Sequence, residues 1–510
     1  MKGSLFTAAA IATIASNMVA AVPGTVHLDV TRKFNSSPKI IKRDTEGTAE
    51  VTLHTPSDMA SMLYFAELQV GTPSQTVYVE VDTGSSDLWI NSASNAYCAT
   101  NISKCAEYGT FDANKSSTLT FGDDYINATY GDGTNAQGPY VHDIVEMGGL
   151  SLTNATFGLV ESKKDMGILG VGYETIEGAH KAPYSNFPAL MVEQGHIASR
   201  VYSLYINDSA SETGSFLFGG IDRAKYEGDM VELPFQLQGI LPVFTKFLVN
   251  LGSIKFSSGS KTVTVGNVNS VALLDSGTSM TYLPNEILDY LVSDLHLASY
   301  DKKLDAIVAP CSARDRTDTL DFGFEGLTIH VPMRDLYYPE WNDDGTPMTD
   351  ADGDQICWFR VLSTDLSGGV VLGDSFLASA YVVYDLDNNV AGVAQAKANV
   401  TESDIVAVGS GKNAILKAIG ASTSNSASST SVTSTITSAP SATHTTLVRS
   451  VINHNTALYN STSNHTATNA TYTSSTPTAS AMTGGAGSLY YSHASLVSLV
   501  AAVIISVFVL

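Results

Sequence analysis

The sequence predicts a mostly β protein made of two similar lobes. Short runs of strand-forming residues, separated by Gly, Pro, Asn and Ser, recur through the middle of the chain, and long helical periods are few. Two aliphatic runs in this region end in matching quartets, Asp-Thr-Gly-Ser at 82–85 and Asp-Ser-Gly-Thr at 275–278. A single triplet of this kind is usually an ordinary turn. Two matched copies point instead to a duplicated lobe with a paired site.

The order of signals after each quartet supports this duplication. Gly-Ile-Leu-Gly at 167–170 follows the first quartet, and Val-Val-Leu-Gly at 370–373 follows the second at a similar spacing. We therefore expect each lobe to present one carboxylate at the end of a buried strand. The glycine two residues after each aspartate lets the chain fold back, so that its amide approaches the carboxylate.

The remaining elements are placed by local pattern. Residues 61–70 read as a strand. Residues 187–195 combine apolar helical spacing with a terminal glycine and predict a short helix. We expect the first lobe over 44–234 and the second over 235–400, so that they meet near Leu233 and Pro234.

Several further motifs give the chain a family resemblance. They are Asp-Leu-Trp at 87–89, Ala-Thr-Tyr-Gly-Asp-Gly at 128–133, the segment 214–222, Leu-Gly-Asp-Ser-Phe-Leu at 372–377 and Tyr-Val-Val-Tyr-Asp at 381–385. With them the chain resembles the pepsin-type aspartic proteases over about residues 60 to 400, and among these the fungal yapsin-like endopeptidases. The resemblance implies two pseudo-symmetric β lobes with the active-site cleft between them. It also implies an aspartic endopeptidase that uses no metal and no other cofactor.

By this resemblance, Asp82 and Asp275 are the catalytic pair. The paired aspartates of such proteases share one proton, because two carboxylates this close do not both ionise cheaply. One member acts as base and the other as acid on a water that attacks the scissile carbonyl. The sequence does not assign the proton to either member. The implied supporting residues are Thr83, Gly84, Ser85, Ser276, Gly277 and Thr278.

Roles within that supporting set also follow from the resemblance. Thr83 and Ser276 are expected to brace the pair across the lobe interface, and Ser85 and Thr278 to bond the outer carboxylate oxygens. The flap is expected to contribute Tyr130, Gly131 and Asp132 to substrate binding, with the Tyr130 hydroxyl partnered by Trp89. In similar fungal proteases an Asp at the position of Asp132 is associated with substrates that carry Lys or Arg just before the cleaved bond. The alternative is that Asp132 only shapes the hairpin turn.

The four cysteines favour two disulfides over free thiols, because the count is even and the N-terminus indicates an oxidising compartment. The resemblance implies one bond in each lobe, Cys98 to Cys105 and Cys311 to Cys357. A zinc site has little support, since no Cys-x-x-Cys and no paired histidine spacing occur.

The N-terminal 43 residues predict secretion and processing. Residues 1–21 combine Lys2, an apolar stretch and small residues before the expected cut, as in a signal peptide. Residues 22–43 form a basic segment that ends in Lys42 and Arg43. We expect it to be a propeptide removed after Arg43 by a kexin-like protease. The alternative is an exposed basic pair without consequence.

The C-terminal region predicts a stalk and an anchor. Residues 401–484 are assigned to a stalk rich in Ser and Thr, which buries too little apolar surface to fold and is expected to be glycosylated. Residues 485–510 end in an apolar tail without a basic flank, as in a GPI-attachment signal, with Gly484 or Gly485 as anchor site. The alternative is a true tail anchor. Sequons in the folded region begin at Asn101, Asn114, Asn127, Asn154, Asn207 and Asn399.

Composition limits the partners. The net charge of −23 argues against nucleic acid and suits an enzyme that works in acid. The expected partners are polypeptide substrates, the kexin-like protease and the membrane through a GPI lipid, with a monomeric enzyme at the plasma membrane or in the cell wall. Two rivals are a non-catalytic peptide-binding protein on this fold and a wall mannoprotein. The first would usually have lost an aspartate or the flap tyrosine, and the second would need no cleft.

Overall fold

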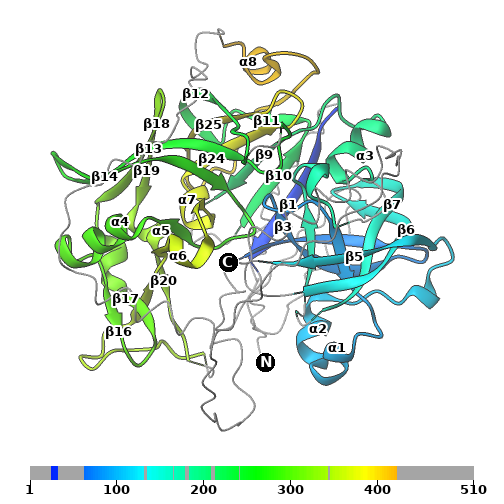
Figure 1. Cartoon of the computed structure of the whole chain (residues 1–510), viewed down its shortest axis with the longest axis horizontal. Helices are drawn as coiled ribbons and strands as arrows, with labels where there is room; N and C mark the ends of the chain where they lie inside the picture. Colours follow the sequence, from blue (N-terminus) through cyan, green and yellow to red (C-terminus); the bar gives the residue numbers. More distant parts are fainter. Residues whose placement is uncertain are drawn as a thin grey trace, which may run out of the picture.

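The fold is that of a computed structural model, which describes residues 24–32, 63–130, 135–162, 164, 166–178, 183–207, 213–239, 242–342 and 345–421. It is mostly β, and the strands form four sheets. In Figure 1 the blue and cyan strands of the first lobe lie on one side and the green strands of the second lobe on the other, with strands from both lobes in the middle. The two-lobed, mostly β prediction is confirmed.

The first lobe contains most of the long strands. Its elements are β1 (Val26–Arg32), β2 (Tyr64–Val70), β3 (Gln75–Asp82), β4 (Leu88–Asn91), α1 (Ala96–Thr100), α2 (Ile102–Tyr108), the 3₁₀ turn η2 (Ala113–Lys115), β5 (Thr120–Thr129), β6 (Asn135–Met147), β7 (Leu150–Ser162), β8 (Gly167–Gly170), the 3₁₀ turn η3 (Glu174–Ile176), α3 (Phe187–Glu193), β9 (Val201–Ile206), β10 (Thr213–Phe218), β11 (Gly220–Asp222) and β12 (Tyr226–Pro234).

The second lobe and the segment after it follow. They comprise β13 (Leu248–Ser258), β14 (Lys261–Leu274), β15 (Thr281–Leu283), α4 (Asn285–Asp289), the π-helical turn η4 (Tyr290–Asp294), β16 (Ser299–Asp301), β17 (Ala306–Pro310), the 3₁₀ turn η5 (Cys311–Asp315), β18 (Thr319–Phe324), β19 (Leu327–Pro332), α5 (Met333–Leu336), β20 (Tyr337–Pro339), β21 (Ile356–Phe359), β22 (Val361–Ser363), α6 (Thr364–Ser367), β23 (Val370–Leu372), α7 (Asp374–Leu377), β24 (Ala380–Asp385), β25 (Val390–Ala396), β26 (Ile405–Ala407) and α8 (Ala414–Ile419).

One large sheet joins the lobes. Its thirteen strands run in the order β12-β25-β24-β9-β10-β1-β2-β3-β8-β4-β7-β6-β5. Strands β24 and β25 come from the end of the second lobe, yet β24 pairs with β9 of the first lobe. A separate seven-stranded sheet, β19-β18-β13-β14-β23-β15-β22, forms the body of the second lobe. The shared strands hold the lobes in one hydrogen-bonded frame.

The duplication seen in the sequence is present in the strand pairing. Strand β3, which ends in Asp82, pairs in parallel with β8, the first Gly-Ile-Leu-Gly run. Strand β14, which precedes Asp275, pairs in parallel with β23, the matching run of the second lobe. Asp82 at the end of β3 and Asp275 directly after β14 therefore each follow a strand that pairs with the same kind of partner.

Alternation along β3 explains why this strand can hold a polar site. Val77, Val79 and Val81 are fully buried in the hydrophobic core. Because successive side chains of a strand point to opposite faces, Glu80 and Asp82 lie together on the other face. Burial of the valines holds the strand in the core, and the opposite face can therefore carry the acidic side chains of Glu80 and Asp82.

Strand β1 lies within the segment predicted to be a propeptide. It pairs with β10 over six residues and with β2 over two, and its apolar side chains Val26, Leu28 and Val30 are buried. Residues 26–32 are thus an integral strand of the large sheet. Removal of 22–43 stays a prediction, and Lys42 and Arg43 lie outside the described residues.

The expected start of the stalk at residue 401 is wrong. Strand β26 pairs with β11, and helix α8 packs Ala414 and Ile415 into a cluster with Met230 of β12, while Leu416 is also buried. These aliphatic residues supply the apolar surface that a stalk lacks, so the folded part extends to residue 421. Residues 422–510, which include Gly484 and Gly485, lie outside the described residues.

Two further expectations hold. The predicted helix at 187–195 is α3, whose N-cap Asn186 accepts a hydrogen bond from the Ala189 amide and whose first turn contains Pro188. Both disulfides form as expected, Cys98 to Cys105 between α1 and α2 and Cys311 to Cys357 between η5 and β21.

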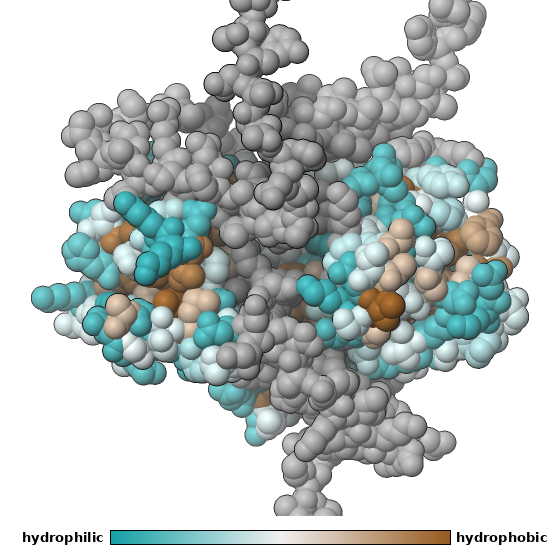
Figure 2. Space-filling view, turned by 90° about the horizontal axis from the view of Figure 1, so that it is seen from below, coloured by the Kyte–Doolittle hydropathy of each residue, from teal (hydrophilic) through white to brown (hydrophobic). Residues whose placement is uncertain are grey.

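The coloured residues on the face shown in Figure 2 are mainly hydrophilic, and the hydrophobic ones form small separate areas. Among the helices described, none has both the length and the apolar composition that a membrane crossing requires.

Candidate active site

The two aspartates meet where the lobes join. Asp82 is the last residue of β3 and Asp275 directly follows β14. Both side chains are nearly buried, with exposed fractions of 7% and 9%, and their carboxyl groups hydrogen-bond to each other. The predicted pair is therefore assembled from two strands almost 200 residues apart in sequence.

Each carboxyl group is held by the turn that follows it. The Gly84 amide donates to Asp82 Oδ1 at 2.7 Å, and the Ser85 hydroxyl donates to Oδ2 at 2.5 Å. In the second lobe, the Gly277 amide donates to Asp275 Oδ1 at 3.0 Å and the Thr278 hydroxyl to Oδ2 at 2.8 Å. Matching atoms in the two lobes thus receive matching donors. The arrangement fixes the carboxyl planes and leaves the groups facing each other.

The hydroxyls of Thr83 and Ser276 cross the lobe interface. The Ser276 amide donates to Thr83 Oγ1 at 2.9 Å, and Thr83 Oγ1 donates to the Leu274 carbonyl at 3.0 Å. Reciprocally, the Thr83 amide donates to Ser276 Oγ at 3.2 Å, and that hydroxyl donates to the Val81 carbonyl at 2.7 Å. These four buried bonds tie the two turns together, so that the pair is positioned by backbone on both sides.

Glycine is required in both turns for steric reasons. A Cβ at Gly84 would overlap the carboxyl group of Asp275, and one at Gly277 would overlap that of Asp82. Each glycine thus lies directly against the aspartate of the other lobe. The sequence suggested that glycine allows the amide to approach its own carboxylate; close packing of the two turns is a second reason.

Burial and charge alter the acidity of the pair. Burial, followed by the negative charge of Asp82, raises the pKa of Asp275 to about 7 from its ordinary 3.8, against the opposing hydrogen bonds from Thr278 and Gly277. A carboxyl with such a pKa retains a proton in acid and up to neutrality. The site can therefore hold one acid and one base together.

The flap tyrosine lies beside this pair. The Trp89 indole nitrogen donates to the Tyr130 hydroxyl at 2.6 Å, as the resemblance implied. Tyr130 packs on the small cluster of Trp89, Ile126, Tyr140 and Ile168, and the Lys164 ammonium lies 5.6 Å from the centre of its ring. Gly131 and Asp132 lie outside the described residues.

Sequence reasoning missed a buried network under the flap. Asp87 accepts hydrogen bonds from the hydroxyls of Tyr140 and Tyr184 at 2.6 and 2.9 Å and from the Gly178 amide at 2.8 Å. Burial raises the pKa of Asp87 despite these donors. The network anchors the strand that holds Trp89. Its donors come from β6 and from a later loop, and nothing in the sequence links these distant positions.

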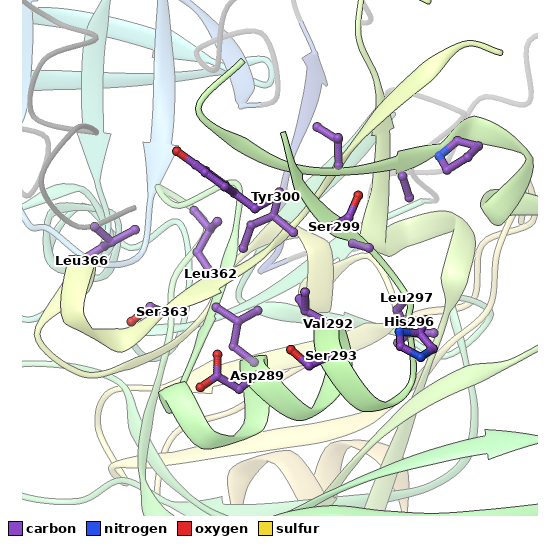
Figure 3. A pocket seen from close by; sticks show the side chains of 16 residues that line it. Asp289, Val292, Ser293, His296, Leu297, Ser299, Tyr300, Leu362, Ser363 and Leu366 are labelled. Carbon is purple, nitrogen blue, oxygen red and sulfur yellow. The ribbon is translucent and has the colours of Figure 1, made fainter. Parts of the chain in front are cut away.

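A separate cavity of about 470 Å³ occurs in the second lobe (Figure 3). The side chains that line it include those of Val292, His296, Leu297, Tyr300 and Leu362, which Figure 3 labels, and none of the residues around the aspartate pair takes part. Across the described parts of the chain, no three His, Cys, Asp or Glu side chains are grouped so as to hold a metal ion.

Comparison with known proteins agrees with the geometry. Residues 63–396 match the family model of eukaryotic aspartyl proteases. A probable aspartic-type endopeptidase OpsB of Aspergillus fumigatus is 36% identical over 404 residues, which cover 77% of this chain and 81% of that protein. The aspartic proteinase yapsin-3 of Saccharomyces cerevisiae is 34% identical over 389 residues, covering 73% of each chain. An acid protease of Saccharomycopsis fibuligera is 34% identical over 344 residues, covering 66% of this chain and 81% of its own length.

The mirrored aspartate turns, the shared sheet and these similarities agree on one conclusion. The chain belongs to the eukaryotic aspartyl protease family and is an aspartic-type endopeptidase.

Proposed function

We propose that the chain is a secreted, cell-surface endopeptidase that hydrolyses peptide bonds in acid through Asp82 and Asp275. The observation that supports this most is the matched set of donors around the two carboxyl groups, together with the raised pKa of Asp275. A structural protein of the wall would have no use for a buried pair that shares a proton.

The chemistry follows from that shared proton. The ionised carboxylate takes a proton from a water between the two groups, and the water oxygen bonds to the scissile carbonyl carbon. The protonated carboxyl stabilises the oxygen that becomes negative. The carbon–nitrogen bond then breaks as a proton passes to the leaving amine, and the pair returns to a single shared proton. Tyr130 closes over the substrate from the flap, held in place by Trp89.

The location is proposed from the ends of the chain. Residues 1–21 direct secretion, and residues 485–510 are exchanged for a GPI lipid at Gly484 or Gly485. The folded enzyme, which continues to residue 421, is then joined to the membrane by a stalk that starts after it. The cell wall is a second destination if the anchor is transferred.

Processing after Arg43 is the regulatory part of the proposal. The expected result is that Arg43→Ala, which resists a kexin-like protease, leaves the full chain with a kcat/KM at least about tenfold below that of the cut wild type. Both forms are assayed on a peptide library from acid to neutral pH. The cut enzyme should be assayed without removing the released N-terminal peptide, because that peptide contains β1, which is part of the large sheet. Equal rates for the two forms would contradict inhibition, and no cleavage by either would favour the mannoprotein.

Substrate preference is proposed to depend in part on Asp132. A flap carboxylate facing a substrate cation in a shielded site contributes roughly 1 to 3 kcal/mol. We therefore expect Asp132→Thr to lower the ratio of kcat/KM for peptides with Lys or Arg before the cut to that for Leu or Phe peptides by about fivefold to a hundredfold. Asn135→Ala, at the start of β6, is the matched control for damage to the hairpin. An unchanged ratio in Asp132→Thr would leave Asp132 as a turn residue.

A further inference from the structure

A hollow on the second lobe gathers arginines. It has a volume of about 600 Å³ and is lined by Arg314, Arg316 and Arg334, with Asp315 beside them. The chain has only nine arginines among its 27 basic residues and a net charge of −23, so a third of its arginines meet at one place in an acidic protein. No lysine is among the described residues that line this arginine hollow. Its volume lies in the range of small-ligand sites, about 300 to 1,000 Å³.

The three arginines are held by different parts of the second lobe. Arg314 lies in η5, which the disulfide of this lobe joins to β21, and Arg316 directly follows η5. Arg334 lies in α5, and the amide of the preceding residue, Met333, donates to the Asp318 carbonyl at 3.3 Å. Because the backbone is tied at these positions, a ligand does not have to order it on binding.

Two of the arginines keep donors that no protein acceptor uses. In Arg316, Nε and Nη2 lie 2.6 and 2.5 Å from Asp318 Oδ2, and the guanidinium carbon is 5.9 Å from the centre of the Phe256 ring. The Nε atom of Arg314 is buried without a hydrogen-bond partner, and no acid that the structure describes forms an ion pair with Arg314. A buried donor without an acceptor costs free energy. The unmade bond therefore favours an acceptor in the hollow.

The acids near the arginine hollow show that charge alone would not hold an anion there. Asp318 and Asp335 are buried, with the Arg334 Nε 3.9 Å from Asp335 Oδ1, and Asp315 is exposed. Three carboxylates thus offset three guanidinium groups. An anion must instead be held by short, directed hydrogen bonds. The planar fork of a guanidinium gives such bonds to phosphate oxygens, whereas the ammonium of lysine acts as a point charge.

A phosphate group suits three separate guanidinium groups better than a carboxylate does. A carboxylate has two oxygens in one plane, which a single guanidinium fork satisfies, whereas a phosphate monoester offers three strong acceptor oxygens. Since a water occupies about 30 Å³, a hollow of about 600 Å³ also exceeds what a phosphate alone fills. There is room for the group that carries the phosphate.

We propose that the arginine hollow is a binding site for the phosphate monoester of a sugar or polyol, with Arg314, Arg316 and Arg334 as donors to the phosphate oxygens. The site shares no residue with the aspartate pair, so this inference goes beyond the proposed peptidase function and is tested without turnover.

The experiment titrates inositol monophosphate into the full chain at low salt, with calorimetry as the readout. The wild type should bind with a Kd of about 1 mM or lower. Arg314→Gln and Arg334→Gln should each raise this Kd at least about fivefold, because each removes a charged donor. Arg314→Lys, which keeps the charge but not the fork, should raise it about threefold. Asp315→Asn should lower it about twofold to fivefold, because an exposed carboxylate no longer repels the ligand.

Arg223→Gln is the matched control, since Arg223 is an exposed arginine that bonds Asp404 through two nitrogens and does not line the hollow. Its Kd should equal that of the wild type. Glucuronate, which carries a carboxylate in place of the phosphate, should bind at least about fivefold more weakly than inositol monophosphate. Melting temperatures separate lost binding from unfolding. Arg334 is exposed, so Arg334→Gln should fold even if Arg314→Gln does not.

Vesicles distinguish two sources of the phosphate. Phosphatidylcholine vesicles that contain phosphatidic acid present a phosphate monoester on a lipid. Binding of inositol monophosphate without retention on these vesicles supports the soluble ligand, and retention that Arg334→Gln abolishes assigns the same chemistry to a lipid headgroup. The proposal is overturned if the wild type binds neither, if glucuronate binds as tightly as inositol monophosphate, or if Arg314→Gln and Arg334→Gln bind like the wild type.

Discussion

Replacement of Asp82 or Asp275 by Asn is expected to lower kcat below about one-hundredth of the wild-type value. An amide has nearly the shape of a carboxyl group, and its oxygen still accepts the bond from the Gly84 or Gly277 amide. It can neither take a proton from water nor share one with the remaining aspartate. Because the two carboxyl groups act as a unit, either single substitution should cost about as much as both together.

The measurement is kcat and KM on one peptide, with a melting temperature for each variant. Asp143→Asn is a suitable control, since Asp143 is another buried carboxylate of the first lobe that accepts bonds from the hydroxyls of Ser116 and Thr118. It should retain most of the activity, because it does not touch the pair. Turnover above about one-hundredth in either catalytic-pair variant would refute the assignment.

The aspartate pair was predictable because its signals are local. Each turn needs Asp, a hydroxyl residue, Gly and a second hydroxyl residue in consecutive positions, and the chain meets that need twice. The bonds across the interface between Thr83 and Ser276 follow once the two turns face each other. That the two turns face each other was inferred from the family resemblance.

Features that depend on distant partners were not predictable. Strand β1 forms because it can pair with β10 on one side and β2 on the other, whereas its sequence alone suggests a basic propeptide. Residues 401–421 look like the start of the stalk until the aliphatic residues of α8 pack on the cluster around Met230. Glu80 breaks the apolar character of its strand, but burial and its missing hydrogen bond are visible only in the folded chain.

The pH dependence of activity should follow the proton on the aspartate pair. Burial and the charge of Asp82 raise the pKa of Asp275 to about 7, so this carboxyl keeps its proton in acid and loses it above neutrality. For a peptide with no titrating group, kcat/KM should fall about tenfold per pH unit above that pKa. A profile from about pH 3 to about pH 9 tests this. A maximum above neutrality would contradict it.

The same pKa predicts how stability changes with pH, and the sign is opposite to that of most acids. The folded-state pKa of Asp275 lies above its ordinary value of 3.8, so folding binds a proton between about pH 4 and pH 7. Stability from this group is fully present below 3.8 and is lost as pH rises to about 7, at up to about 1.4 kcal/mol per pH unit. Asp275→Asn has no proton to lose there. The melting temperature of Asp275→Asn should therefore rise relative to that of the wild type as pH increases from about 4 to about 7. If the difference in melting temperature between the two proteins is the same at every pH, the fold does not hold the carboxyl pair in its protonated form.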